Sequence, residues 1–260
     1  MGKDWDQHVL EAEELASSEG FERLRDEIVR LARPTRDDVV VDVGAGTGLL
    51  TLTLAPRVAK VWAIDISPAM LAHLAMKAAT AELANVETAA ANAVRLPLAN
   101  GSASLVVSNY CYHHLSDEDK EQGLVEVLRV LQPGGRVVIA DMMFRVQMTD
   151  RRNRHVIASK IRAFLRRGPA GVLRLLKNGL RLLSGRWEQP ADADWWRRAL
   201  KRSGYTDIEI RLLEHEGGII TARRPIASRR ERRWRPSRVP IAGRPDRSAA
   251  RRSPHSPVQR

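Results

Sequence analysis

Apolar residues alternate along the chain between short β-branched runs and longer stretches with helical spacing. The short runs predict buried strands of a parallel sheet, and the helical stretches predict the connecting helices. The predicted strands are residues 39–43, 61–64, 105–109 and 137–140, and predicted helices are residues 9–16, 21–32, 49–54 and 194–203. Residues 207–213 and 218–222 flank a short turn and predict an antiparallel strand pair. This order predicts an α/β fold built around one open sheet.

The first predicted strand runs into a glycine-rich turn, Gly44-Ala45-Gly46-Thr47-Gly48. Glycine lets the backbone turn sharply and approach a ligand, because it has no Cβ. Residues 49–54 then predict the first turns of a helix whose free amides face that ligand. Asp65 ends the next strand, where a carboxylate can accept two hydrogen bonds from a ribose diol. We therefore expect an adenosine cofactor.

The spacing of the glycines distinguishes between adenosine cofactors. The dinucleotide fingerprint is G-x-G-x-x-G, and Leu49 stands where its third glycine would be. Asp42, before the turn, would repel a pyrophosphate but suits a ligand that carries an ammonium group. From the turn alone, a dinucleotide enzyme and a purely structural turn remain alternatives.

Four segments between about Asp37 and Met142 resemble class I S-adenosylmethionine-dependent methyltransferases, in the family's order and at fitting intervals. The turn resembles motif I, which holds the methionine part of the cofactor, and residues 65–71 (DISPAML) resemble the post-I segment. Asn92-Ala93 resembles the loop that touches the adenine edge, although the family more often has an acid at position 92. Residues 127–136 (VLRVLQPGGR) resemble the joint into the fifth strand, with Pro133 ending the helix and Gly134-Gly135 supplying the turn.

The resemblance implies a Rossmann-like, seven-stranded methyltransferase sheet with an antiparallel last strand, and S-adenosylmethionine as the cofactor. Within this family, the chain is similar to the small-molecule enzymes of the ubiquinone/menaquinone-methyltransferase-like group. It implies that Asp65 binds the ribose hydroxyls and that Ile66 packs on adenine. The implied cofactor-binding residues are Asp42, Gly44, Ala45, Gly46, Thr47, Gly48, Asp65, Ile66, Met70, Asn92, Ala93 and Asn109.

Candidates for catalysis follow the fourth strand. His114 or His113 could act as a base, since histidine titrates near neutrality, but paired histidines in this loop also occur in the family as packing beside the cofactor. Tyr110 and Tyr112 could line an acceptor pocket or simply belong to the core. No third ligand stands near the histidines at a spacing that suits a metal, so none is expected. Cys111 has no paired base in the sequence and is not expected to be a nucleophile.

Positive charge is confined to two segments. Residues 1–150 carry 14 Lys and Arg against 22 Asp and Glu, whereas residues 151–187 carry 11 basic residues and no acidic one. That second segment has apolar positions at helical spacing, among them Ile157, Ile161, Phe164 and Leu176. It predicts a cap insertion of two amphipathic helices at about 145–188. The cap could simply pack on the core, also rest on an anionic membrane, or face an anionic substrate or nucleic acid.

Residues 223–260 carry 13 basic residues against 2 acidic ones, with six prolines. We expect a disordered tail that is either solvated or a weak contact for nucleic acid or anionic lipid. The domain prediction is therefore an N-terminal helical lid at 1–35, a methyltransferase domain at 36–222 and this tail. One cysteine and a charged N-terminus favour a cytoplasmic protein, with peripheral membrane contact as an option.

The predicted function is transfer of a methyl group from S-adenosylmethionine to a small, lipophilic acceptor by in-line displacement. Two alternatives stay open: an RNA methyltransferase that uses the basic segments, and a non-catalytic S-adenosylmethionine-binding protein. Enzymes that methylate an exocyclic amine of a nucleic-acid base resemble one another in an Asn/Asp-Pro-Pro-Tyr or Asn-Ile-Pro-Tyr motif at this position. Here the tripeptide after Asn109 has no proline, which argues against that class of enzyme. The sequence does not indicate an oligomeric state.

Overall fold

The computed structural model describes residues 5–144, 189–213 and 217–226, and the single residues Arg154, Ala158, Arg162 and Gly168. The cap helices expected at about 145–188 lie, apart from those four residues, outside the described part. The strands are β1 (Val39–Val43), β2 (Lys60–Asp65), β3 (Val86–Ala90), β4 (Ala103–Asn109), β5 (Leu131–Met142), β6 (Thr206–Leu212) and β7 (Gly217–Arg223). The helices are η1 (Trp5–His8), α1 (Val9–Ala16), α2 (Glu19–Ala32), α3 (Leu49–Leu54), η2 (Ala55–Arg57), α4 (Pro68–Thr80), η3 (Tyr112–His114), α5 (Asp117–Val130) and α8 (Ala193–Ser203).

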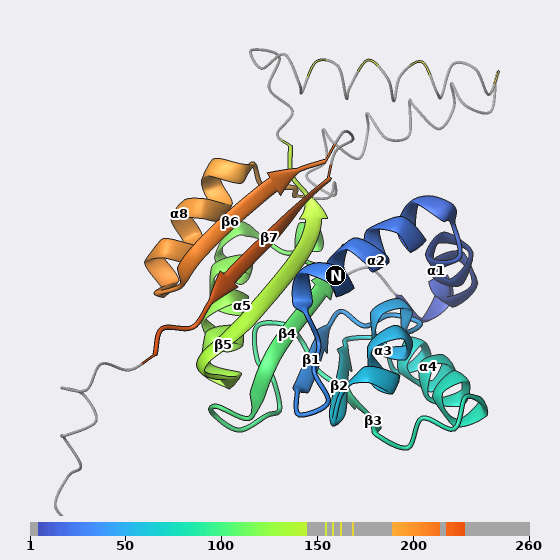
Figure 1. Ribbon diagram of the computed structural model, residues 1–260. Helices are drawn as coiled ribbons and strands as arrows, with labels where there is room; N and C mark the ends of the chain where they lie inside the picture. The colour runs from blue at the N-terminus through green and yellow to red at the C-terminus, as the bar shows by residue number, and fades with distance from the viewer. Residues whose placement is uncertain are drawn as a thin grey trace, which may run out of the picture. The chain divides into compact units, whose positions relative to one another are not determined.

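The strands form one seven-stranded sheet in the order β3-β2-β1-β4-β5-β7-β6 (Figure 1). Strands β1 to β5 are parallel, and β7 pairs antiparallel with both β5 and β6. The chain passes from β1 outward through β2 to β3 and then returns to place β4 on the other side of β1. Because α/β sheets bind their ligands where the strand order reverses, this topology favours a ligand site at the carboxyl ends of β1 and β4. The predicted Rossmann-like sheet is confirmed.

Side chains alternate between the two faces of the sheet and build a core on each. One face, with Val40, Leu105 and Val138, packs against Ile28 of α2 and Leu50 of α3. The opposite face, with Val41, Val106 and Ile139, packs against Val127 of α5 and Trp196 of α8. The helices therefore cover both faces of the sheet, as a parallel sheet requires (Figure 1).

Local signals end the helices where the sequence predicted. Asp192 caps α8 by accepting a hydrogen bond from the Trp195 amide at 2.7 Å, and Gly204 ends that helix with φ +95°. Both Trp195 and Leu200 are buried, as expected.

Two expectations are corrected. Pro133 and Gly134 do not lie between a helix and a strand, because α5 ends at Val130 and β5 already begins at Leu131. Leu131 pairs with Ala103 while Arg136 pairs with Leu105, so residues 132–135 form a bulge inside the strand. The second correction concerns the C-terminal boundary, because the chain divides after Ile226 and not after residue 222.

Candidate active site

The glycine-rich turn, the end of β2 and the end of β4 meet at the crevice beside β1. Gly44 and Ala45 donate their amides to the Ile64 carbonyl at 2.8 and 3.0 Å, which fixes the turn against β2. Gly46 donates its amide to Asp65 Oδ2 at 2.8 Å. The loop after β3 joins them, because the Ala91 amide donates to the Asp65 carbonyl at 2.9 Å. The structure therefore brings together motif I, Asp65 and the Asn92-Ala93 loop.

The three glycines of the turn have positive φ angles, but their surroundings differ. A Cβ on Gly44 would stand 2.5 Å from Cys111 Sγ, and one on Gly48 would stand 2.9 Å from Leu74. A Cβ on Gly46 would meet no heavy atom within 4 Å. Close packing inside the protein thus explains Gly44 and Gly48, whereas the turn presents Gly46 to open space where a ligand can approach its backbone.

Asp42 and Asp65 place two carboxylates beneath this turn. Asp42 is 1 % exposed, and its Oδ2 accepts a hydrogen bond from the Thr51 hydroxyl at 2.7 Å. Burial, with a contribution from the nearby Asp65 carboxylate, raises the pKa of Asp42 to about 7. Burial also raises the pKa of Asp65, although backbone amides of Ser67 and Gly46 oppose the shift. Two neighbouring acids with raised pKa values would be stabilised in their charged forms by a cation.

The remaining predicted cofactor residues lie around this pair in different environments. Ile66, at the tip of β2, is 58 % exposed, whereas Met70 is buried and its amide donates to Ser67 Oγ. Asn92 Oδ1 accepts from the Val94 amide at 3.2 Å, and Ala93 is buried in the core. Thr47 is buried under the N-terminal segment through a hydrogen bond with Glu13.

Asn109, the last residue of β4, has a polar atom that the described residues do not satisfy. Its Oδ1 is buried and has no hydrogen-bond partner in the described part of the chain. A buried acceptor usually has a donor, so this oxygen is suited to a ligand N–H or O–H at the crevice.

The two candidate histidines have unlike surroundings. His113 is buried, and its Nδ1 lies 2.6 Å from Asp141 Oδ1 at the end of β5. His114 is exposed, and its ring lies edge-on to Trp5 of η1 with centroids 4.6 Å apart. Cys111 lies beside the turn at Gly44, and burial, followed by the charges of Asp141, Asp65 and Asp42, raises the pKa of its thiol far above the usual range. The thiol therefore stays protonated and is a poor nucleophile.

Tyr110 connects β4 to this histidine pair with a strained backbone. Its φ is +52°, a conformation that costs about 1–3 kcal/mol for a residue with a Cβ. Its ring packs against Phe21 of α2 and His113, with centroid distances of 5.0 and 5.6 Å. Tyr112, in contrast, is buried in the core against Trp196 and does not line the crevice.

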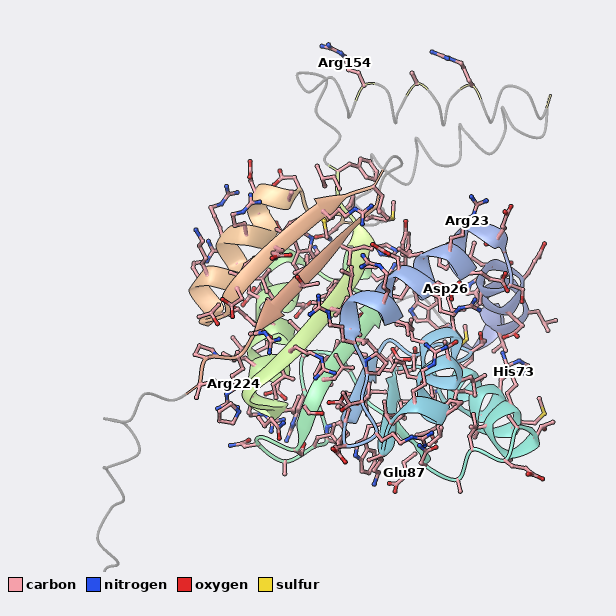
Figure 2. The ribbon with its side chains drawn as sticks, viewed as in Figure 1. Arg23, Asp26, His73, Glu87, Arg154 and Arg224 are labelled. Carbon is pink, nitrogen blue, oxygen red and sulfur yellow. The ribbon has the colours of Figure 1, made fainter. Side chains whose placement is uncertain are left out.

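The N-terminal segment, η1 with α1, also contacts this site beside the glycine-rich turn. Asp6 accepts hydrogen bonds from the Ser67 hydroxyl at 2.5 Å and from the Ala69 amide at 3.2 Å. Glu13 pairs with Lys77 at 2.5 Å and with His73 at 3.5 Å, both on α4; His73 is labelled in Figure 2. The segment thus spans the glycine-rich turn, the first turn of α4 and the histidine pair.

Sequence reasoning missed Asp141, Trp5, Asp6 and Glu13. Asp141 had a usable signal, because it ends a predicted strand at the same edge as Asp65. The N-terminal contacts had none, since they join residues about 60 positions apart, such as Asp6 and Ser67. Within the part of the chain that the structure describes, no group of three or more His, Cys, Asp or Glu residues is arranged to hold a metal ion. Nor is any described helix long and apolar enough to cross a membrane.

Comparison with known proteins agrees with this geometry. Residues 40–135 match the family described as a methyltransferase domain. An uncharacterized methyltransferase of Anoxybacillus flavithermus is 30 % identical over 126 residues, which cover 48 % of this chain and 55 % of that protein. A malonyl-[acyl-carrier protein] O-methyltransferase of Hahella chejuensis is 36 % identical over 119 residues, which cover 45 % of this chain and 40 % of that protein. The chain spans about half the length of the curated relatives it matches.

The fold also agrees with solved structures. The chain superposes with a TM-score of 0.60 and 19 % identity on the crystal structure of a Methanococcus maripaludis protein that is described as an S-adenosyl-L-methionine-dependent methyltransferase. The match covers 88 % of this chain and 97 % of the other. The expected resemblance is therefore confirmed for the fold and for the domain at residues 40–135.

Proposed function

We propose that residues 40–135, which match the methyltransferase domain family, act as a class I S-adenosylmethionine-dependent methyltransferase, and that the protein transfers a methyl group from this cofactor to a small, hydrophobic acceptor. The observation that carries the proposal is the pair of carboxylates beneath the open backbone of Gly46, the buried Asp42 and the half-buried Asp65. This arrangement combines an acceptor for ribose hydroxyls with a negative field that favours a cationic ligand.

The residues fit S-adenosylmethionine better than a dinucleotide. Asp42 at the turn would repel a pyrophosphate, whereas the two acids together attract the ammonium and sulfonium groups of S-adenosylmethionine. Asp65 accepts the amides of Gly46 and Ser67 on its two oxygens, and since a carboxylate offers about four lone-pair sites, it can also accept from a ribose hydroxyl. Ile66 is exposed beside it and offers an apolar surface on which adenine can pack.

The methyl group and its activation come with the cofactor. The work that remains for the protein is to align the acceptor, exclude water and accept a proton where the acceptor must lose one. In this proposal the N-terminal segment covers the turn and excludes water, and His113 or His114 is the candidate base. The buried and hydrogen-bonded His113 is held more firmly than the exposed His114.

The acceptor side is lined by rings, which supports the hydrophobic character of the acceptor. Trp5 of η1 packs on His114, Tyr110 after β4 packs on His113, and Phe21 of α2 packs on Tyr110. Pockets for small molecules are mostly apolar with a few placed polar groups, and this set has that composition.

Calorimetry with S-adenosylmethionine and with NAD tests the cofactor, and Asp65→Ala tests the site. We expect binding of S-adenosylmethionine alone and a loss of about 30- to 150-fold in its affinity in Asp65→Ala, because a charge-assisted, two-point contact is removed. The matched control is Asp26→Ala, which removes an exposed carboxylate on α2, labelled in Figure 2. Unchanged affinity in Asp65→Ala would place the site elsewhere, and preferential binding of NAD would contradict the proposed function.

Assays of methyl transfer then separate an enzyme from a binding protein. Purified protein with labelled cofactor is offered small hydroxylated acceptors, RNA and buffer alone. Label that appears only in small molecules supports the proposal. Label in RNA supports the alternative that uses the basic segments, and tight cofactor binding without any transfer supports a non-catalytic role.

A further inference from the structure

We propose that Asp141 holds His113 as the general base of the reaction and that the acceptor group is therefore an acidic hydroxyl, of the phenol or enol type, on a planar ring. This inference rests on the proposed methyl transfer and deepens it by naming a positioning residue and an acceptor class.

The Asp141 carboxylate is built to hold the His113 ring. It is fully buried and accepts three N–H hydrogen bonds: from the His113 ring, from the His113 amide at 3.1 Å and from the Met142 amide at 2.6 Å. The Gln189 amide donates to the His113 carbonyl at 2.7 Å and fixes the backbone from the other side. The ring therefore has one orientation, with Nδ1 turned to Asp141.

This contact also determines which ring nitrogen can accept a proton. An ionised carboxylate only accepts hydrogen bonds, so Nδ1 carries the hydrogen that lies between it and Oδ1. Nε2 then has a lone pair and is the basic atom. A buried imidazole with a carboxylate behind it is stabilised when Nε2 takes up a proton, as a general base requires.

The pair lies next to the cofactor turn. Asn109 of β4 pairs with Ala140 of β5, so Asp141 follows directly at the same carboxyl edge of the sheet. Cys111, two residues before His113, is the side chain against which Gly44 packs. One residue, Tyr112 of η3, separates His113 from Cys111, so the base lies close to the glycine-rich turn.

The other groups that face His113 are aromatic or neutral. Tyr110 meets its ring edge-on at 5.6 Å, and the His114 ring lies 3.9 Å away. Cys111, directly before η3, is kept protonated by its raised pKa. Asp141 is therefore the charged group in direct contact with the ring, and Asp42 and Asp65 act on this region from the far side of Cys111.

These surroundings select among acceptor chemistries. A carboxylate has already lost its proton at neutral pH, and a neutral amine has a free lone pair, so neither needs a base before attack. A phenol or enol hydroxyl has to lose its proton as the new bond forms, and a positioned base assists that loss. The rings of Trp5, Phe21 and Tyr110 add flat apolar surfaces that suit a planar ring.

The step balances. The acceptor O–H proton moves to His113 Nε2, and an oxygen lone pair forms the C–O bond to the methyl carbon. The carbon–sulfur bond breaks and its electrons stay on sulfur, which turns the sulfonium into a neutral thioether. His113 later releases its proton to solvent, and Asp141 keeps the Nδ1 hydrogen throughout.

The test is a panel of phenols and enols of graded acidity, given to full-length wild type, His113→Gln and Asp141→Asn with saturating S-adenosylmethionine. For weakly acidic members we expect kcat to fall about 10²- to 10⁴-fold in His113→Gln and at least about tenfold in Asp141→Asn. Members that are already ionised at the assay pH should be methylated by both variants within about threefold of wild type, because they need no base. A merely structural role would lower all rates alike.

A second readout does not depend on turnover. The bonded His113 Nδ1–H should give a downfield proton resonance in the wild-type protein, and both substitutions should remove it while S-adenosylmethionine affinity is kept. Glu118→Gln, which alters an exposed carboxylate in the first turn of α5, is the matched control and should change neither readout. If Asp141→Asn does not fold, the acidity dependence of His113→Gln decides alone.

The outcomes separate the two proposals. Variants that keep wild-type rates across the panel, or cofactor binding with transfer to amines or carboxylates and none to the panel, overturn this inference and leave methyl transfer intact. Absence of S-adenosylmethionine binding in the wild-type protein overturns the proposed function itself.

Discussion

Among single residues, Asp42 has the property from which a pH dependence follows most directly. Its pKa is about 7 in the protein, against 3.8 for an ordinary aspartate, chiefly because it is buried. A bound cation favours the ionised form, so binding below pH 7 has to release a proton. We expect the association constant for S-adenosylmethionine to rise by up to about tenfold per pH unit below pH 7 and to level off above it.

Calorimetry across that pH range checks this expectation, with Asp42→Asn as the variant that cannot titrate. The slope should be lost in Asp42→Asn, and a slope that persists would assign the proton to another group such as Asp65. The effect on folding has the opposite sign. Since the folded pKa lies above the unfolded one, the folded protein binds the extra proton, and its stability without cofactor should fall as the pH rises from about 4 to 7.

The glycines show what could be predicted at this scale and what could not. The motif predicted a sharp turn at these glycines, and in the structure all three have positive φ angles. The reason for Gly44 could not be predicted, because Cys111 lies 67 positions away in the chain and meets it only in the folded sheet. Contacts between distant segments are what a local pattern does not contain, and Asp141 beside His113 is the same case.

At the scale of elements, the strands and helices of the core could be predicted because their signals are local. Alternation, capping residues and terminal glycines placed β1, β4, α3 and α8 within a few residues of their bounds. The joint before β5 could not, because Pro133 and Gly134 signal a break that the sheet absorbs as a bulge. Pairing of β5 with β4 decides that geometry, and the sequence of β5 alone does not show it.

The N-terminal segment, η1 with α1, is the element for which we predict a dynamic role. Asp6 bonds to the first turn of α4, and Trp5 packs on His114, so the segment closes over the turn through few contacts. We expect Asp6→Ala to raise the dissociation rate of S-adenosylmethionine about 5- to 30-fold, because two hydrogen bonds to a charged group are lost. Stopped-flow displacement measures this rate.

A control on the same segment keeps that prediction specific. Glu14→Ala removes an exposed acid of α1 and should leave the dissociation rate unchanged. Hydrogen exchange should show faster exchange at residues 5–16 in Asp6→Ala and not in Glu14→Ala. An unaltered rate in Asp6→Ala would mean that the segment packs on the core without covering the cofactor.

At the scale of the whole molecule, the boundary after Ile226 allows the role of the unevenly distributed positive charge to be tested by truncation. The compact unit ends at Ile226, and the residues just before that point are anchored in it. Arg224, labelled in Figure 2, donates through Nη1 to the carbonyls of Leu128, Arg129 and Leu131, and its amide donates to the Gly135 carbonyl at 2.8 Å. Residues 227–260 carry 11 arginines against 2 acids.

Two truncations should therefore behave differently. Ending the chain after Ile226 should leave the melting temperature and S-adenosylmethionine affinity unchanged, because the β7 pairing and the Arg224 bonds are kept. Ending it after Ala222 removes several buried hydrogen bonds of about 1 kcal/mol each and should lower the melting temperature by about 5–15 °C. If the full chain binds RNA or anionic vesicles, both truncations should lose that binding. In the full chain the binding should weaken steeply with added salt. A melting temperature that falls equally in both truncations would contradict the boundary at Ile226 and would show that residues beyond it stabilise the methyltransferase domain.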